Sequence, residues 1–166
     1  MISWLKGNLL EKLPAQIVLD VNGVGYDVAI SMTTFFSLPN EGENYSCFIQ
    51  TIVREDTLAL FGFSARQERS LFRALIKING IGPKVALGIL SSTTCSDFVK
   101  IIQQKNLKSL IKLPGIGKKT AERLLIELSD SLSEMLIDSD VCEPNDLNEQ
   151  TSSTLAREEA SQALVS

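Results

Sequence analysis

The chain has 166 residues, 44% of them apolar and 22% charged, which suits a globular protein of one or two small domains and argues against a disordered or collagen-like one. No apolar run approaches the roughly 18 residues that a bilayer-spanning helix needs. The first residues lack the basic leader and apolar stretch of a secretory signal. These observations predict a cytoplasmic protein that has no membrane segment.

Residues that commonly perform catalysis or bind metals are scarce. Histidine, the most frequent general base and metal ligand, is absent. The three cysteines, Cys47, Cys95 and Cys142, are widely separated, so they predict neither a zinc site nor a disulfide framework. We therefore expect no metal, no cofactor and no catalytic residue in this chain.

Charge is distributed unevenly along the sequence. The whole chain has a net charge of −4, which by itself argues against a nucleic-acid partner. However, residues 1–63 carry a net −4, residues 64–128 a net +8 with 12 of the 16 Lys and Arg, and residues 129–166 a net −8. Since charges are screened beyond a Debye length of about 10 Å, the basic middle segment can attract a polyanion although the chain is acidic. The alternative is that its charges only solvate helical faces.

The first 63 residues predict strands that are short, rich in β-branched residues and separated by Gly, Asn and Pro. The expected strands are residues 2–9, 16–21, 25–30, 46–53 and 58–63. Five strands of this length predict a small closed or partly open barrel of the OB type. Arg54, Glu55 and Asp56 place three successive charges between the last two strands, where we expect the tip of a hairpin.

From Ser64 onward the apolar residues follow helical spacing, which predicts an all-helical domain over residues 64–136. The fold class is therefore a β-barrel followed by an all-α domain. Residues 137–154 are rich in Asp, Glu, Asn and Ser and predict an acidic flexible linker. Residues 155–166, preceded by the N-cap residue Thr154, predict the start of a truncated C-terminal helical domain.

A repeat lies within the helical segment. A shift of 35 residues places residues 75–86 on residues 110–121, and eight of the twelve aligned positions are identical. Each copy predicts a helix, a tight turn containing Gly-Ile-Gly and a second helix. Glycine can adopt a positive φ and lets another backbone approach closely; the glycines of the two turns are Gly80, Gly82, Gly115 and Gly117. We expect the isoleucine between each pair to point inward.

Each turn leads into a helix N-terminus, where unpaired N–H groups and the helix dipole favour an anion. Lys84 lies beside the first N-terminus, and Lys118, Lys119 and Thr120 lie beside the second. Contacts of this kind bind phosphates without distinguishing bases. The two turns are therefore candidate phosphate sites.

Other glycine-rich sites do not fit these turns. A dinucleotide site needs a third glycine where Val85 and Thr120 stand, and a strand before the turn. A nucleotide-triphosphate loop needs a glycine where Lys112 stands and a single Lys before the hydroxyl residue. One Gly-Ile-Gly turn could merely close a helical hairpin, but two copies with the same lysine favour phosphate binding.

Gly80-Ile81-Gly82 and the equivalent residues 115–117 resemble tandem helix-hairpin-helix motifs, which bind DNA phosphates without sequence preference. Together with the barrel, the Val-Arg-Glu-Asp of residues 53–56 and residues 113–124, they resemble the RuvA family of Holliday-junction recognition subunits. The resemblance covers about residues 1–136 and extends more weakly to residues 155–166.

The resemblance implies structure-specific, sequence-independent binding of four-way DNA junctions, which are held open for branch migration in homologous recombination, DNA repair and the SOS response to DNA damage. It also implies a homotetramer, or two tetramers that sandwich the junction. Glu55 and Asp56 correspond to the acidic pins of the family, which stand near the junction centre. Carboxylates repel phosphates, so a ring of them would keep the crossover open.

The partners implied by the resemblance are the RuvB hexamer, an ATPase that drives the DNA through the junction, and the RuvC resolvase. ATP hydrolysis belongs to RuvB, so the chain itself is expected to be non-catalytic. The family contacts RuvB through a third domain, of which this chain carries only the opening helix, in residues 155–166. Junction binding is expected without that domain, whereas stimulation of RuvB depends on it.

Two alternatives use the same motif. The first is a general adaptor in a repair complex that holds duplex DNA with its hairpins and has no junction preference. The second is a base-excision glycosylase, for which Asp130 is the nearest candidate carboxylate. The glycosylase alternative lacks a further globular half that would enclose a flipped base.

Overall fold

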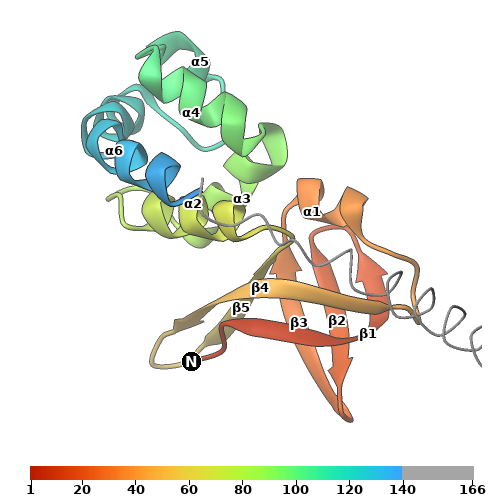
Figure 1. The fold of residues 1–166 in the computed structure, drawn as a ribbon. Coiled ribbons are helices and arrows are strands. Elements are labelled where there is room, and N and C mark those ends of the chain that lie inside the picture. The colour runs from red at the N-terminus through yellow and green to blue at the C-terminus, as the bar shows by residue number, and fades with distance from the viewer. Residues whose placement is uncertain (140–166) are drawn as a thin grey trace, which may run out of the picture. The chain divides into compact units, whose positions relative to one another are not determined.

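The structure, a computed structural model, describes residues 1–139 of the chain, with side chains through Leu132. The N-terminal part is a closed barrel of five strands, which confirms the predicted OB-like fold (Figure 1). The strands are β1 (Trp4–Leu13), β2 (Gln16–Val21), β3 (Val24–Ile30), β4 (Asn44–Val53) and β5 (Leu58–Phe63). Around the barrel they follow the order β1, β2, β3, β5, β4, and only the β3–β5 pair is parallel.

The first strand is longer than the sequence predicted, since β1 continues to Leu13. It pairs with β4 along its first half and with β2 along its second, and its register with β2 shifts between Leu9 and Glu11. A bulge of this kind bends a strand and increases its twist, so β1 can close the barrel by pairing with two neighbours. The barrel core includes the fully buried side chains of Leu9, Ile17, Leu19, Val28 and Ile49.

A short helix that the sequence did not predict, α1 (Met32–Ser37), lies between β3 and β4. Its N-cap is Ser31, whose Oγ accepts a hydrogen bond from the backbone N of Thr34 at 3.1 Å. Both side chains are completely buried. The capping therefore fixes where the chain leaves β3.

The helical part contains α2 (Arg66–Ile76), α3 (Pro83–Ser92), α4 (Cys95–Gln103), α5 (Leu107–Ile111) and α6 (Lys118–Ser139). Helices α2 and α3 form the first predicted hairpin, and α5 and α6 form the second. One apolar cluster, which includes Leu75, Ile89, Phe98, Ile102 and Leu124, joins helices α2, α3, α4 and α6. The second half of the described chain is therefore all-helical, as predicted.

The barrel and the helices share a packed contact. Phe72 of α2 lies against Phe61 and Phe63 of β5, with ring centroids 5.1 and 5.0 Å apart. Helix α1 adds polar contacts to α3, because the backbone N of Met32 donates to Ser91 Oγ at 2.9 Å. Thr33 Oγ1 likewise donates to the Leu90 carbonyl at 2.7 Å. These contacts couple the first hairpin to the barrel.

The predicted linker begins at residue 137, but α6 extends to Ser139. The rest of the linker, to residue 154, and the helix expected over residues 155–166 lie outside the described residues. Among the helices that are described, none alone is long and apolar enough to cross a membrane; α3 and α4 reach that length and hydropathy only when taken together across a bend of 97°.

Candidate nucleic-acid interface

The two Gly-Ile-Gly turns have the same backbone hydrogen bonds. In the first turn, Ile81 N donates to Ile78 O at 3.1 Å and Ala86 N donates to Gly82 O at 3.0 Å. The second turn has the equivalent bonds, from Ile116 N to Leu113 O at 3.3 Å and from Ala121 N to Gly117 O at 2.9 Å. Ile81 and Ile116 are both buried, with 4% and 6% of their surface exposed. The sequence repeat is thus a structural repeat, and each central isoleucine points inward.

The glycines within a turn have different roles. Gly80 and Gly115 have φ values of +99° and +76°, in the left-handed region that favours glycine. Gly82, in contrast, has a φ of −88°. A Cβ on Gly82 or Gly117 would meet no atom within 4 Å. Nothing in the described fold requires these second glycines, so the bare backbone there is open to a molecule outside the chain.

The turns contact each other reciprocally. A Cβ on Gly115 would lie 3.1 Å from both methyl carbons of Val85, which belongs to the first turn of α3. A Cβ on Gly80 would lie 3.6 Å from Oγ1 of Thr120, which belongs to the first turn of α6. The 35-residue shift converts one pair into the other. The left-handed glycine of each hairpin therefore faces the start of the other hairpin's second helix.

A second reciprocal pair extends this relationship. Arg123 Nη1 donates to the Asn79 carbonyl at 3.3 Å. The same shift relates this pair to Gly88 and Pro114, where a Cβ on Gly88 would lie 3.4 Å from Pro114 Cγ. In both cases, a residue of the first hairpin contacts a residue of the second, and the equivalents of these two residues contact each other in exchanged roles. A two-fold axis produces this pattern of contacts. The two hairpins are therefore related by a local two-fold.

This arrangement leaves both helix N-termini without side-chain caps of the usual kind. The N-cap of α3 is Gly82, which provides no side-chain acceptor, and Pro83 occupies the first helical turn. Helix α6 begins at Lys118, directly after Gly117. The first N–H groups of a helix have no intrahelical partner and bind anions readily. Each hairpin thus has the uncapped helix start that a phosphate site of the predicted kind would use.

The predicted lysines surround these N-termini. Lys84, Lys118 and Lys119 are exposed, whereas Thr120 is half-buried against Gly80. Within residues 1–132 the single ion pair joins Lys100 to Asp97 at 3.7 Å, so none of these three lysines is neutralised by a carboxylate there. The described fold therefore leaves the charge of all three lysines exposed.

The predicted acidic hairpin lies in the barrel, on the turn between β4 and β5. Arg54 N donates to the Thr57 carbonyl at 2.8 Å, and Thr57 N donates back to the Arg54 carbonyl at 3.4 Å. These bonds close a loop whose two central residues are Glu55 and Asp56, both exposed. The carboxylates therefore form a group of their own, on a different element from the hairpin glycines and lysines.

Sequence reasoning missed the residues that hold the two turns together, above all Val85 and Arg123. The 35-residue shift could have indicated them, because it aligns Val85 with Thr120 at the start of each second helix. Sequence reasoning also missed a row of cations on α2, although Arg66, Arg69 and Arg73 follow helical spacing. Amphipathic analysis of apolar residues alone does not detect such a row.

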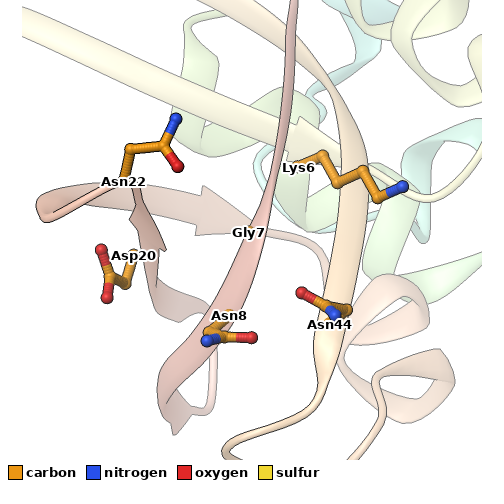
Figure 2. A pocket seen from close by; sticks show the side chains of 6 residues that line it. All are labelled: Lys6, Gly7, Asn8, Asp20, Asn22 and Asn44. Carbon is orange, nitrogen blue, oxygen red and sulfur yellow. The ribbon is translucent and has the colours of Figure 1, made fainter.

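A polar hollow of about 380 Å³ lies on the outside of the barrel (Figure 2). Its lining comes from β1, β2, β4 and the turn after β2 and consists of Lys6, Gly7, Asn8, Asp20, Asn22 and Asn44. Gly7 permits a close approach of β1 to β2, since a Cβ there would lie 2.1 Å from the Asp20 carbonyl oxygen. The hollow contains none of the predicted site residues.

Comparisons with known proteins agree with this architecture. The family model described as RuvA N terminal domain matches residues 1–62, and the one described as SAM-like Helix-hairpin-helix tandem matches residues 72–130. Similar proteins named Holliday junction branch migration complex subunit RuvA include that of Legionella pneumophila (strain Corby), 50% identical over 99% of this chain and 81% of the relative. That of Photorhabdus laumondii is 46% identical over 100% of this chain and 83% of the relative. The closed barrel, the paired hairpins and these similarities together establish that the chain belongs to the RuvA family.

Proposed function

We propose that this chain binds four-way DNA junctions by their phosphate backbone, independently of sequence, and holds them open for branch migration in recombination and repair. The observation that carries the proposal is the pair of uncapped helix N-termini, related by a local two-fold, each preceded by a glycine whose α-carbon faces open space. The similar proteins are named as a subunit of a Holliday junction branch migration complex, which supports the proposal.

The proposed binding is electrostatic and joins backbone N–H groups of the protein to phosphate groups of the DNA. At each turn, N–H groups at the helix start would donate to phosphate oxygens, and the second glycine would let the phosphate approach without meeting a Cβ. Lys84, Lys118 and Lys119 would add charge, and Thr120 a hydroxyl. None of these groups distinguishes one base from another, which agrees with binding that depends on DNA shape.

Glu55 and Asp56 would act by repulsion. Their carboxylates are exposed at the tip of the β4–β5 hairpin. If four copies assemble around the junction, four such tips meet near its centre and keep the phosphates of neighbouring arms apart. The pins would therefore shape the crossover instead of binding it.

The assembly that this function needs has several components. We propose a homotetramer, or two tetramers on opposite faces of the junction, that works with the RuvB motor and the RuvC resolvase in the cytoplasm. The chain is proposed to be non-catalytic, with ATP hydrolysis in RuvB. The contact with RuvB belongs to the C-terminal region, outside the described residues.

A gel-shift titration tests the proposal. The chain is added to a four-way junction and to a linear duplex of matched length, at two salt concentrations and with excess competitor duplex. The expected result is a marked preference for the junction. Equal affinity would favour the general duplex adaptor, and binding to neither would leave the repeat as a structural feature alone.

A further inference from the structure

Helix α2 carries a row of cations that the hairpin sites do not include. The row consists of Arg66, Arg69 and Arg73 of α2 and its C-cap residue Lys77, spaced by three, four and four residues, so all four lie on one face. The one acidic residue of α2, Glu68, is buried and accepts hydrogen bonds from hydroxyl groups. In the part of the chain whose side chains are described, no carboxylate lies within ion-pair distance of the row.

The arginines are held by the barrel instead of by opposite charges. The guanidinium carbons of Arg66 and Arg69 lie 5.5 and 5.3 Å from the centroid of the Phe48 ring on β4. Arg69 Nη1 also donates to the Ser3 carbonyl at 2.8 Å. Stacking on an aromatic ring orients a guanidinium while its charge remains unneutralised.

The centre of the row is electrostatically unfavourable by itself. Arg69 Nε is buried and has no hydrogen-bond partner among the described residues. Burial lowers the pKa of Arg69, and the like charges of Arg73 and Arg66 lower it further. Arg73 Nε donates to Gln50 Oε1, a neutral acceptor. Among the residues whose side chains are described, no carboxylate compensates the charge of the cluster.

We propose that this row is a second contact surface for the phosphodiester backbone of DNA, additional to the two hairpin turns. The inference rests on the proposed function, because it assumes that DNA lies on the helical domain. Helix α2 leads directly into the first turn, and Lys77 stands three residues before Gly80. A backbone held at the first hairpin can therefore continue along α2, where guanidinium groups suit phosphate oxygens.

The row also follows β4 toward the acidic hairpin. Arg66 and Arg69 lie over Phe48, Arg73 contacts Gln50 two residues further on, and β4 ends at Val53 beside the acidic turn. The Lys77 end of the row therefore points toward both the first hairpin and the acidic turn, so the cations would attract a DNA strand that the nearby carboxylates repel. The alternative occupant of the row is an acidic surface of a second copy of the chain. Binding of such a surface would not explain why the row adjoins the first hairpin turn.

The test compares two double variants with the same positions changed. Arg66→Gln with Arg73→Gln removes two charges, whereas Arg66→Lys with Arg73→Lys keeps them. Each is titrated on a four-way junction at 50 and 200 mM salt. Because each phosphate contact contributes about 0.9 to the salt slope, the Gln variant should lose roughly 1.8, and its affinity ratio between the two salts should shrink about twelve-fold. The Lys variant should keep most of the slope.

Arg66→Gln alone covers the case in which the double variant does not fold. Arg66 is exposed and its side chain contacts the Phe48 ring, so the fold should survive its replacement, and the salt slope should fall by about 0.9. Equal thermal midpoints for wild type and variant establish that the fold is intact. A folded variant with the wild-type slope would overturn the proposal.

Two further measurements separate this inference from the proposed function. Lys84→Glu with Lys119→Glu is titrated in parallel: if that variant loses binding while the α2 variants do not, the hairpin function stands and the α2 surface is rejected. Sedimentation of the DNA-free protein measures the assembly. A changed mass in the Gln variant would assign the row to a subunit interface and would also overturn the proposal.

Discussion

The side chain of Val85 packs against the bare α-carbon of Gly115, with both methyl carbons 3.1 Å from the position that a Cβ would occupy there. Val85 belongs to the first hairpin and Gly115 to the second, so this contact holds the two turns together. The equivalent contact, between Thr120 and Gly80, holds them from the other side. The position of each helix start therefore depends on the left-handed glycine of the other hairpin.

Alanine substitution should separate the two kinds of glycine. Gly82→Ala and Gly117→Ala place a methyl group in open space, so the thermal midpoint should remain near that of wild type. The same methyl group would block the approach of a phosphate, and junction affinity should fall. Melting curves and gel-shift titrations measure both effects. Unchanged affinity would mean that the turns do not bind phosphate.

Gly115→Ala should reduce the stability of the protein, in contrast to Gly82→Ala. Its φ of +76° is unfavourable for alanine, and the new methyl group would lie 3.1 Å from Val85. The left-handed conformation alone costs roughly 1–2 kcal/mol, so the free energy of unfolding should decrease by at least about that amount. Urea unfolding measures it. A stability equal to that of Gly82→Ala would contradict the contact between the turns.

Reversal of the hairpin charges should weaken binding to every DNA. Lys84→Glu with Lys119→Glu places two carboxylates at the helix N-termini, where they would compete with phosphates. We expect lower affinity for junction and duplex alike and a salt slope reduced by about 0.9 for each lost phosphate contact. Titration at several salt concentrations gives the slope. Exposed lysines elsewhere, such as Lys105, provide the matched control.

Neutralisation of the acidic hairpin should act in the opposite direction. Glu55→Gln with Asp56→Asn removes two exposed carboxylates without disturbing the backbone bonds that close the turn. Because the pins are proposed to repel phosphates, affinity for the junction should stay the same or increase while its geometry changes. Fluorescence energy transfer between labelled arms reports that geometry. A large loss of affinity would show that the carboxylates bind instead of repel.

Removal of the buried carboxylate should destabilise the connection between barrel and helices. Glu68 Oε2 accepts from Ser64 Oγ at 3.1 Å and from Thr34 Oγ1 of α1 at 3.4 Å. Glu68→Ala leaves both hydroxyls without this acceptor, so we expect a loss of about 1–3 kcal/mol in unfolding free energy. Glu68→Gln retains an acceptor oxygen and should lose less. Equal urea midpoints for the two variants would refute this role.

Stability should decrease in alkaline solution. Burial raises the pKa of the Cys47 thiol from 9.0 to about 12. The folded state therefore favours the protonated thiol, and its contribution is complete below pH 9 and is lost as the pH rises toward 12, at up to about 1.4 kcal/mol per pH unit. Burial also raises the pKa of Tyr45, which acts in the same direction. Urea unfolding from pH 8 to 11 should show a weaker decline in Cys47→Ala.

The barrel and the hairpins could be predicted because their sequence patterns are local. Alternating β-branched residues indicated the strands, and the repeat indicated both turns, with Ile81 and Ile116 inward. Helix α1 could not be predicted, since its sequence, Met-Thr-Thr-Phe-Phe-Ser, contains β-branched and aromatic residues of modest helix propensity. Its only local signal is the Ser31 cap, and contacts with α3 stabilise the rest.

The site was predictable only in part, for a similar reason. The glycines and lysines follow from the repeat, whereas the contacts between the turns require the three-dimensional fold. That Gly115 packs against Val85, thirty residues earlier, is a tertiary relationship. The same applies to the arginines of α2, whose spacing is visible in the sequence but whose support by Phe48 is not.

The local two-fold between the hairpins also concerns strand polarity. The strands of a duplex run in opposite chemical directions, so a two-fold axis across the grooves exchanges them. A grip with the same symmetry would present each strand with an equivalent glycine turn and helix start. Reversing a duplex arm would then leave its contacts unchanged. Strand exchange continually rebuilds the arms of a migrating junction, and a grip of this symmetry would hold each new arm as it held the last.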